Sequence, residues 1–210
     1  MTRAEIRQRI LDGANEPDAA FVTAAQVDAL IGEAAEVVAE ESGAIKRSHL
    51  LALQPGVRLY SLRALSPDAM SPYRLWLVGE ERRLEARSMA ALDQEHERWP
   101  TVTGQPWYWY PVSWDLFGLW PAPTEGGGLL RVDTLEWPRA LLDDDDAPES
   151  MEAEHDALVA YGVYDVLAKR WDAKGMLEAW SAFLRRWSDA RSRSGVKRVQ
   201  ARDWQTGPAE

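Results

Sequence analysis

The chain has 210 residues, of which 46% are hydrophobic, so it holds enough apolar material for one compact domain or for a domain with an insert. It contains no cysteine, which excludes disulfides, thiolate metal sites and cysteine catalysis. The net charge of −10 argues against general binding of nucleic acid, because phosphate contacts need clustered lysine and arginine. No apolar segment has the length of a signal sequence or a membrane span, so we expect a protein that is made in the cytoplasm and does not enter a membrane.

Two helices are predicted near the start of the chain. Residues 2–5 and 23–26 both match a capping box, in which a threonine and a glutamate or glutamine satisfy backbone donors at a helix start. Apolar residues then recur at helical spacing, most regularly from Val27 to Val38. Gly13 and Gly43 are placed to end the two helices, because glycine tolerates the left-handed conformation of a helix C-terminus.

The centre of the chain has the pattern of short strands and tight turns. After Gly56 apolar and polar residues alternate, and tryptophan, tyrosine, proline and glycine are frequent from Trp99 to Pro138. Gly79-Glu80 is expected to form one turn, and the glycines at 126–128 are expected to form a hairpin turn between the last two strands. The predicted strands cover 57–62, 73–78, 82–85, 107–110, 115–120 and 129–137, with a short helix within 88–98.

Helix is predicted again after this centre. Asp146, Pro148 and Glu149 stand where an N-cap, a first-turn proline and a capping glutamate belong. The helix is expected to stop at Gly175, and a more clearly amphipathic helix follows until Ser188. Helices at both ends around a strand-rich centre predict an α+β fold, in which the N- and C-terminal helices form one bundle that carries a Trp-rich β-sheet insert. The expected parts are a helical bundle of residues 1–50 and 146–190, a β-rich insert of residues 51–145 and a basic C-terminal tail of residues 191–210.

The charge of the chain is divided unevenly. From Lys169 to Glu210 there are ten basic residues against five acidic ones, whereas the first 168 residues hold fourteen against twenty-nine. An acidic body with a basic end offers a polarity for docking. The tail is either a frayed, solvated terminus or an anchor in which Trp204 enters a pocket of a partner. The candidate contact residues are Val196, Lys197, Arg198, Val199, Arg202 and Trp204.

Four consecutive aspartates, Asp143, Asp144, Asp145 and Asp146, form the densest charge feature of the sequence. They lack the alternating ligands, the central glycine and the final glutamate of an EF-hand loop, so no metal site is expected. Two interpretations remain open. Either the run is a solvated turn whose last member caps a helix, or several copies of it line the inside of a ring, where carboxylates repel a DNA backbone and let it pass.

Tryptophan is unusually abundant, with eleven in the chain. Those of the insert are interpreted as core or as a subunit interface, since aromatic rings bury a large apolar area, and the alternative is a stacking platform for sugars or bases. Trp171, Trp180 and Trp187 are predicted to form core or helix–helix contacts. The tryptophans in and beside the insert region are Trp99, Trp107, Trp109, Trp114, Trp120 and Trp137.

The sequence signatures of enzymes are absent. No nucleophile elbow, phosphate loop or dinucleotide fingerprint occurs, and no two of the three histidines have metal-ligand spacing. His155, between two acidic residues, is expected on the surface of a helix. The spacing of the insert's carboxylates selects no pair of acid and base for hydrolysis. We therefore expect a protein that is not an enzyme and that has no cofactor and no metal. The carboxylates considered are Asp115, Glu125, Asp133 and Glu136.

Several segments resemble a known family. Ser48–Gly56, leading into Val57–Leu62, resembles a segment of the head–tail adaptor (connector) proteins of tailed bacteriophages or gene-transfer-agent-like particles. A leucine-proline pair that is typical after this strand is missing, since Leu62 is followed by Arg63. The other segments that carry the resemblance are Gly104–Tyr108, Leu119–Pro123, and Trp137–Leu142 with the aspartates, Pro148 and the helix of His155 and Tyr161.

This resemblance implies a structural protein of the virion that assembles as a homo-oligomeric ring, usually of twelve copies. The ring would lie beneath the capsid portal at the head–tail junction and extend the channel through which the packaged DNA passes without specific binding. It would also present a platform to tail, nozzle or stopper proteins, and Val196 to Trp204 would dock on the portal. A cyclic ring needs two different adhesive faces on each chain. The alternative function is a carbohydrate- or ligand-binding module that uses the Trp-rich insert.

Overall fold

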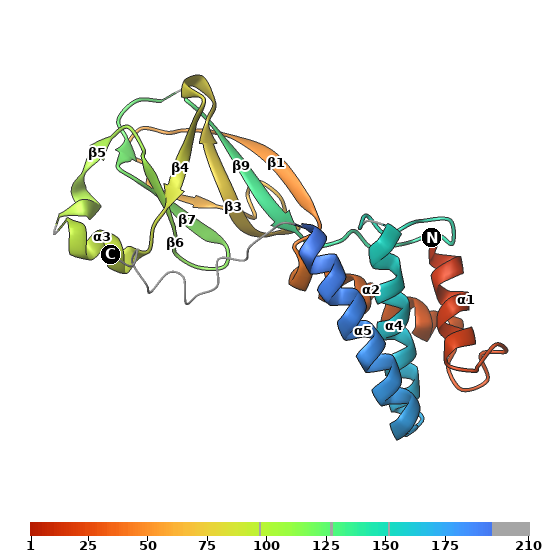
Figure 1. Ribbon diagram of the computed structural model, residues 1–210. Helices are drawn as coiled ribbons and strands as arrows, with labels where there is room; N and C mark the ends of the chain where they lie inside the picture. Colours follow the sequence, from red (N-terminus) through yellow and green to blue (C-terminus); the bar gives the residue numbers. More distant parts are fainter. Residues whose placement is uncertain (97, 127, 151, 195–210) are drawn as a thin grey trace. The chain divides into compact units, whose positions relative to one another are not determined.

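The computed structural model describes residues 1–96, 98–126, 128–150 and 152–194 (Figure 1). The α+β class is confirmed: these residues form five α-helices and a curled sheet. The chain divides into two compact units, which we call the helical unit (residues 1–45 and 137–194) and the β unit (residues 46–136). Within the described ranges, no helix combines the length and the apolar character that crossing a bilayer requires.

The helical unit begins with the two helices that the capping boxes predict. Helix α1 (Arg3–Gly13) starts after Thr2, whose hydroxyl accepts from the Glu5 N–H while the Glu5 carboxylate accepts from the Thr2 N–H. Helix α2 (Ala24–Ser42) repeats this arrangement at Thr23 and ends at Gly43, which has a φ of 61°. Both predicted capping boxes are confirmed. Each depends only on residues three positions apart, so the sequence alone is sufficient to predict it.

Helices α4 (Glu152–Lys169) and α5 (Ala173–Ser194) complete the unit, and α4 packs against α1, α2 and α5. The shared core is aliphatic, with Ile6 and Ile10 of α1, Ile31 of α2 and Leu158 of α4 fully buried. The α1 and α4 backbones approach closely at Gly162, where an added Cβ would lie only 2.8 Å from Ile10 Cγ1.

The start of α4 differs from the prediction. The helix begins at Glu152, and Asp146 does not cap it. Instead the Asp146 carboxylate accepts from the N–H groups of Leu142 and Asp143, at 2.7 and 2.8 Å, and closes a turn within its own loop. An aspartate satisfies the backbone donors that are nearest to it, and here these belong to residues that precede it.

The end of α4 was also predicted wrongly. The helix ends at Lys169, and Trp171 takes a φ of 59° in the turn that follows. Asp172 then accepts from the Gly175 N–H at 3.0 Å, so Gly175 lies in the first turn of α5 and does not terminate a helix. The capping carboxylate at Asp172 decides the boundary, because it satisfies a donor at a new helix start.

The β unit is built on a seven-stranded sheet with the order β1-β9-β3-β4-β6-β7-β2 (Figure 1). All of its neighbouring strands are antiparallel except β4 and β6, which are parallel. The strands are β1 (Lys46–Ala52), β2 (Leu59–Ser61), β3 (Ala69–Leu77), β4 (Arg82–Ala86), β6 (Tyr108–Pro111), β7 (Leu116–Trp120) and β9 (Leu129–Glu136). The short strands β5 (Thr103–Gly104) and β8 (Ala122–Pro123) pair separately, and the remaining elements are α3 (Met89–Glu95) and the 3-10 turns η1 (Val78–Glu80) and η2 (Trp99–Thr101).

The pairing of the strands was predicted in part. The β3–β4 hairpin around Gly79-Glu80 is confirmed, as is a short helix after Ser88. The hairpin across the glycines is wrong, because β9 pairs with β1 and β3 and not with β7. The Leu53 N–H donates to the Gly128 carbonyl at 2.8 Å, so the glycine segment is attached to the end of β1.

Two aromatic and aliphatic clusters fill the β unit. The larger one lies under β3, β7 and β9 and includes Leu75, Phe117 and Val132, all fully buried. The smaller one joins Leu92 of α3 to Trp99, Tyr110 and Trp120. Tyr110 lies directly across Gly118 of the paired strand β7, and its ring occupies the space that any side chain at position 118 would need.

Candidate functional site

The described part of the chain holds no group of three or more histidine, aspartate or glutamate side chains arranged to bind a metal ion. Two clusters of charged side chains stand out among the described residues, one in each unit. Three surfaces can contact a partner: the acidic loop, the exposed tryptophans and the outer face of α5.

The acidic loop packs on the start of α1. Its carbonyl groups at Asp144 and Asp146 accept from the N–H groups of Ala4 and Arg3, which lie in the first turn of α1 and have no partner within the helix. The Asp144 carboxylate also accepts from Arg3, at 2.9 Å, and from Arg7, at 2.6 Å. Negative charge is favoured at a helix N-terminus, so the aspartate run stabilises α1 where it lies.

The pKa values of two aspartates in this loop are lowered by the hydrogen bonds that they accept. Hydrogen bonds from Arg7 and Arg3 lower the pKa of Asp144, and the backbone donors of Asp143 and Leu142 lower the pKa of Asp146. Arg7 also holds Asp28 of α2 in a two-pronged contact at 2.6 and 2.9 Å. Two of the four aspartates therefore have structural partners, while Asp143 and Asp145 are exposed on the loop.

A second ion cluster is buried in the sheet of the β unit. Asp133 of β9 has no exposed surface and accepts from Ser48 on β1 and from Arg74 on β3, each at 2.6 Å. Burial alone raises the pKa of Asp133, but these hydrogen bonds and the nearby arginines outweigh it, and the pKa is lowered. Glu136, also buried, is held by Arg47 at 2.7 Å and by His49 at 2.6 Å.

This cluster is structural. Asp133 and Glu136 were two of the carboxylates considered for hydrolysis, and both are closed off from solvent and saturated by partners on neighbouring strands. A general acid or base must reach a substrate proton, which these groups cannot do. Their signal in the sequence was weak, because the partners lie on strands that are distant along the chain.

The tryptophans of the β unit separate into buried and exposed ones. Trp99, Trp109 and Trp120 are buried, as the core interpretation predicts. Trp107 and Trp114 are exposed, but an arginine covers one face of each ring, with Arg82 3.7 Å from the ring centre of Trp107 and Arg63 4.3 Å from that of Trp114. Each exposed ring is thus paired with an arginine, a combination of residue types that is enriched in protein–protein interfaces. The remaining predicted position, Trp137, is partly exposed in the helical unit.

Helix α5 carries an apolar stripe on its outer side, which we call the α5 stripe: Leu177, Trp180 and Leu184. The three side chains are 61%, 36% and 40% exposed, while Phe183 on the inner side is buried. Their spacing along the helix places them on one side. Trp180 also contacts Tyr164 of α4, with ring centres 4.9 Å apart. The stripe is thus an extension of the core that stays open to solvent.

Two other predictions in this unit are wrong. Trp171 is not a core residue, since it is 93% exposed in the α4–α5 turn. His155 is not on the surface: it is buried, with Nδ1 3.0 Å from the amino group of Met1, and burial and this amino group lower its pKa. His155 precedes the buried Leu158 by three positions, and this helical phase was the signal that could have placed it inside.

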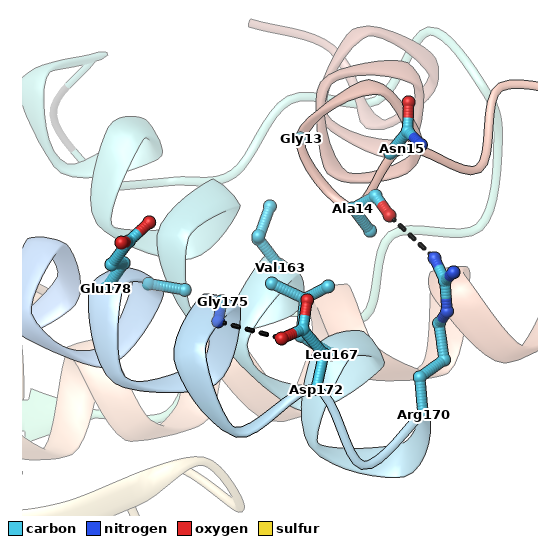
Figure 2. A pocket seen from close by; sticks show the side chains of 10 residues that line it. Gly13, Ala14, Asn15, Val163, Leu167, Arg170, Asp172, Gly175 and Glu178 are labelled. Carbon is cyan, nitrogen blue, oxygen red and sulfur yellow. Dashed lines mark hydrogen bonds between the residues drawn. The ribbon is translucent and has the colours of Figure 1, made fainter.

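A pocket of about 370 Å³ opens in the helical unit where α1 ends and α4 turns into α5 (Figure 2). Arg170 crosses it to donate to the Ala14 carbonyl at 3.0 Å, and also pairs with Glu16. Asp172, on the other side, is occupied by the Gly175 N–H. Arg170 and Asp172 of the pocket thus bind backbone groups at the ends of helices.

The predicted portal contacts lie outside the described residues. These are Val196, Lys197, Arg198, Val199, Arg202 and Trp204, all beyond Ser194.

The family model of the SU10 adaptor protein matches residues 1–209. The chain belongs to this family. The resemblance to phage head–tail adaptors is thereby confirmed, and the adaptor is a structural component of a bacteriophage particle that contacts other head or tail proteins. No curated protein matches the chain. The adaptor's surfaces fit this class, since they offer apolar and charged faces for protein contacts.

Proposed function

We propose that the adaptor works as one copy of a closed ring of twelve, placed beneath the capsid portal at the head–tail junction. The observation that carries this proposal is the family match over residues 1–209. The exposed α5 stripe supports it, because a cyclic assembly needs an adhesive face on every copy. In this role the ring extends the DNA channel and gives tail, nozzle or stopper proteins a platform, and it performs no catalysis.

The two units divide this work. The helical unit, built from both ends of the chain, forms the wall of the ring, and the β unit presents the platform to the tail. The exposed rings of Trp107 and Trp114, each covered by an arginine, are suited to protein contacts, since tryptophan and arginine are enriched in interface hot spots.

The acidic loop lines the channel in this proposal. Asp143 and Asp145 are exposed, and their carboxylates repel the phosphate backbone so that DNA passes without adhering. Asp144 and Asp146 keep the loop attached to α1.

The basic tail docks on the portal. Lys197, Arg198 and Arg202 supply charge, and Val196, Val199 and Trp204 supply apolar contacts. Deleting residues 194–210 is expected to leave the far-UV circular dichroism and the unfolding midpoint unchanged and to abolish co-sedimentation with the portal protein of the same phage. Unchanged co-sedimentation of the truncated chain would remove the tail from the proposal.

Negative-stain microscopy of the full-length adaptor mixed with that portal protein tests the ring itself. We expect portal particles that carry an additional ring layer on one side. Portal particles without added density, at adaptor concentrations well above those of the portal, would rule out the proposed function.

A further inference from the structure

The α5 stripe is an open apolar face whose partner the fold of a single chain does not supply. Leu177 and Leu184 lie about two turns apart, with Trp180 between them. Single exposed apolar residues are ordinary on protein surfaces, but three on one side of a helix, continuous with the core through Tyr164, form a contact ridge.

The charged residues beside the α5 stripe indicate which kind of surface can pack against it. The exposed residues Lys174 and Arg185 flank the stripe about three turns apart on the side away from the core, and Lys174 also lies 4.0 Å from the Glu178 carboxylate. Helix α5 as a whole has five basic residues against two acidic ones. A partner surface should therefore be acidic and free of bulky side chains along its middle.

Helix α2 has such a surface on the side opposite its core. The whole helix carries five carboxylates and no basic residue; Glu33 and Glu36 are exposed on this side, whereas Asp28 is held by Arg7 of α1. The short residues Ala25, Ala29 and Gly32 lie on the same exposed side, and no atom lies within 4 Å of a Cβ built at Gly32. Short side chains let a second helix approach closely, while the acids meet its basic edge.

We propose that the α5 stripe of one copy of this chain packs across the exposed side of α2 of the next copy. The two faces differ, so the contact is head-to-tail and repeats from copy to copy, as a cyclic assembly requires. This inference deepens the proposed ring by naming the two surfaces that meet, and it rests on that function.

Engineered cysteines test the contact directly, because the chain has no cysteine of its own. A variant with Ala29→Cys and Leu177→Cys should give, on mild oxidation, a ladder of covalent dimers, trimers and higher species. The matched control combines Ala29→Cys with Leu142→Cys, since Leu142 is 76% exposed in the same unit but lies off the stripe, and it should give no ladder. Equal ladders from both variants, or no ladder from the first, overturn the proposal.

The single-cysteine variants decide the symmetry. Mixing the Ala29→Cys chain with the Leu177→Cys chain should give a mixed dimer as the main product. If Leu177→Cys alone dimerises as efficiently, two α5 stripes meet each other and the head-to-tail contact is wrong. A ring seen by microscopy together with no ladder rejects this contact and leaves the proposed function in place. A ladder without any ring supports the contact and rejects the proposed ring.

Charge reversal provides a second, independent test. Glu33→Lys with Glu36→Lys, or Lys174→Glu with Arg185→Glu, should each reduce cross-linking of the cysteine pair roughly tenfold or more, and the two sets combined should restore it. A combined variant no better than either set alone would contradict the pairing of these faces. Circular dichroism of every variant separates these results from misfolding.

Discussion

The helical unit and the β unit differ in where their ion pairs lie. In the helical unit the core is mainly aliphatic, with Glu154 and His155 of α4 also buried, and the ion pairs of Arg3, Arg7 and Asp144 lie at its edge with part of their surface in solvent. In the β unit, Asp133 and Glu136 are buried within the sheet and tied to arginines on neighbouring strands. Buried charges are destabilising when unpaired, so the β unit depends on the arginines that hold Asp133 and Glu136.

The two units also differ in what they expose. The β unit covers its exposed tryptophans with arginine side chains, whereas the helical unit leaves the α5 stripe and Trp171 open. A closed polar network suits a rigid presenting surface. An open apolar ridge suits a face that is buried on assembly. The β unit also exposes apolar side chains, among them Leu50, Leu59 and Leu129. We expect self-association at the α5 stripe because its three exposed apolar side chains lie along one side of a single helix.

The largest effect is expected when the buried network of the β unit loses its cations. Arg74→Met combined with Arg131→Met leaves Asp133 buried with only Ser48 as a partner, which should reduce the free energy of unfolding by ~3–5 kcal/mol. The control is Arg9→Met, whose partner Asp156 is half exposed, and it should change stability by less than ~1 kcal/mol. Urea unfolding followed by tryptophan fluorescence measures both. Similar losses would show that the network is not what holds the sheet.

A smaller effect is expected at the two glycines that allow close packing. Gly118→Ala places a Cβ within the ring of the buried Tyr110 and should cost ~3 kcal/mol, because neither strand can move away. Gly162→Ala should cost only ~1 kcal/mol, since Ile10 can shift its side chain and alanine favours the helix by about 1 kcal/mol. Thermal unfolding measures both losses of stability. A larger loss for Gly162→Ala than for Gly118→Ala would mean that the α1–α4 contact is the less adaptable one.

On acidification, the helical unit should lose stability at a higher pH than the β unit. The pKa of His155 is below its ordinary value of 6.5, so the folded chain binds this proton less readily than the unfolded chain. The stability that neutral His155 supports is full above pH 6.5 and is lost as the pH falls toward the lowered pKa. Asp133 also has a lowered pKa, but its ordinary value is 3.8, so the β unit loses this contribution only in stronger acid.

Hydrogen exchange at pH 7, 5.5 and 4 checks that order. Amides of α1 and α4 should lose protection between pH 7 and 5.5, while those of β1, β3 and β9 keep theirs until about pH 4 or below. In His155→Asn the change between pH 7 and 5.5 should vanish. Loss of protection in β1, β3 and β9 at a higher pH than in α1 and α4 would contradict this order.

The smallest effect is expected at Trp171. Because its side chain is 93% exposed, Trp171→Ser should change the free energy of unfolding by less than ~0.5 kcal/mol. Chemical denaturation measures this, and a loss above ~1 kcal/mol would mean that the turn is packed more tightly than its exposure indicates.

Local signals in the sequence predicted local structure well. The capping boxes at Thr2 and Thr23 depend on residues three positions apart, and both formed as predicted. The β3–β4 hairpin also follows from a short turn between alternating segments. These features need no information from distant parts of the chain, which is why one sequence was sufficient.

Features that depend on distant partners were missed. Strand β1 was not predicted, because its register with β9 is set by pairs such as Ser48 with Asp133. Asp146 was assigned to the helix that follows it, whereas its loop is held by α1, far away in sequence. Trp180 contacts Tyr164 of α4, as predicted for a helix–helix residue, whereas Trp171 is exposed, since periodicity identifies an apolar arc but not how much of it a neighbour covers.

Mass photometry of the full-length adaptor, alone and with its portal protein, tests the central claim most directly. We expect a discrete closed species of many copies, on its own at high concentration or on the portal, and we expect its loss when Leu177→Asp is introduced into the α5 stripe. The matched Leu50→Asp, at a position of nearly equal exposure (63%) in the β unit, should leave the species intact. An adaptor that stays monomeric under both conditions would contradict the proposed ring.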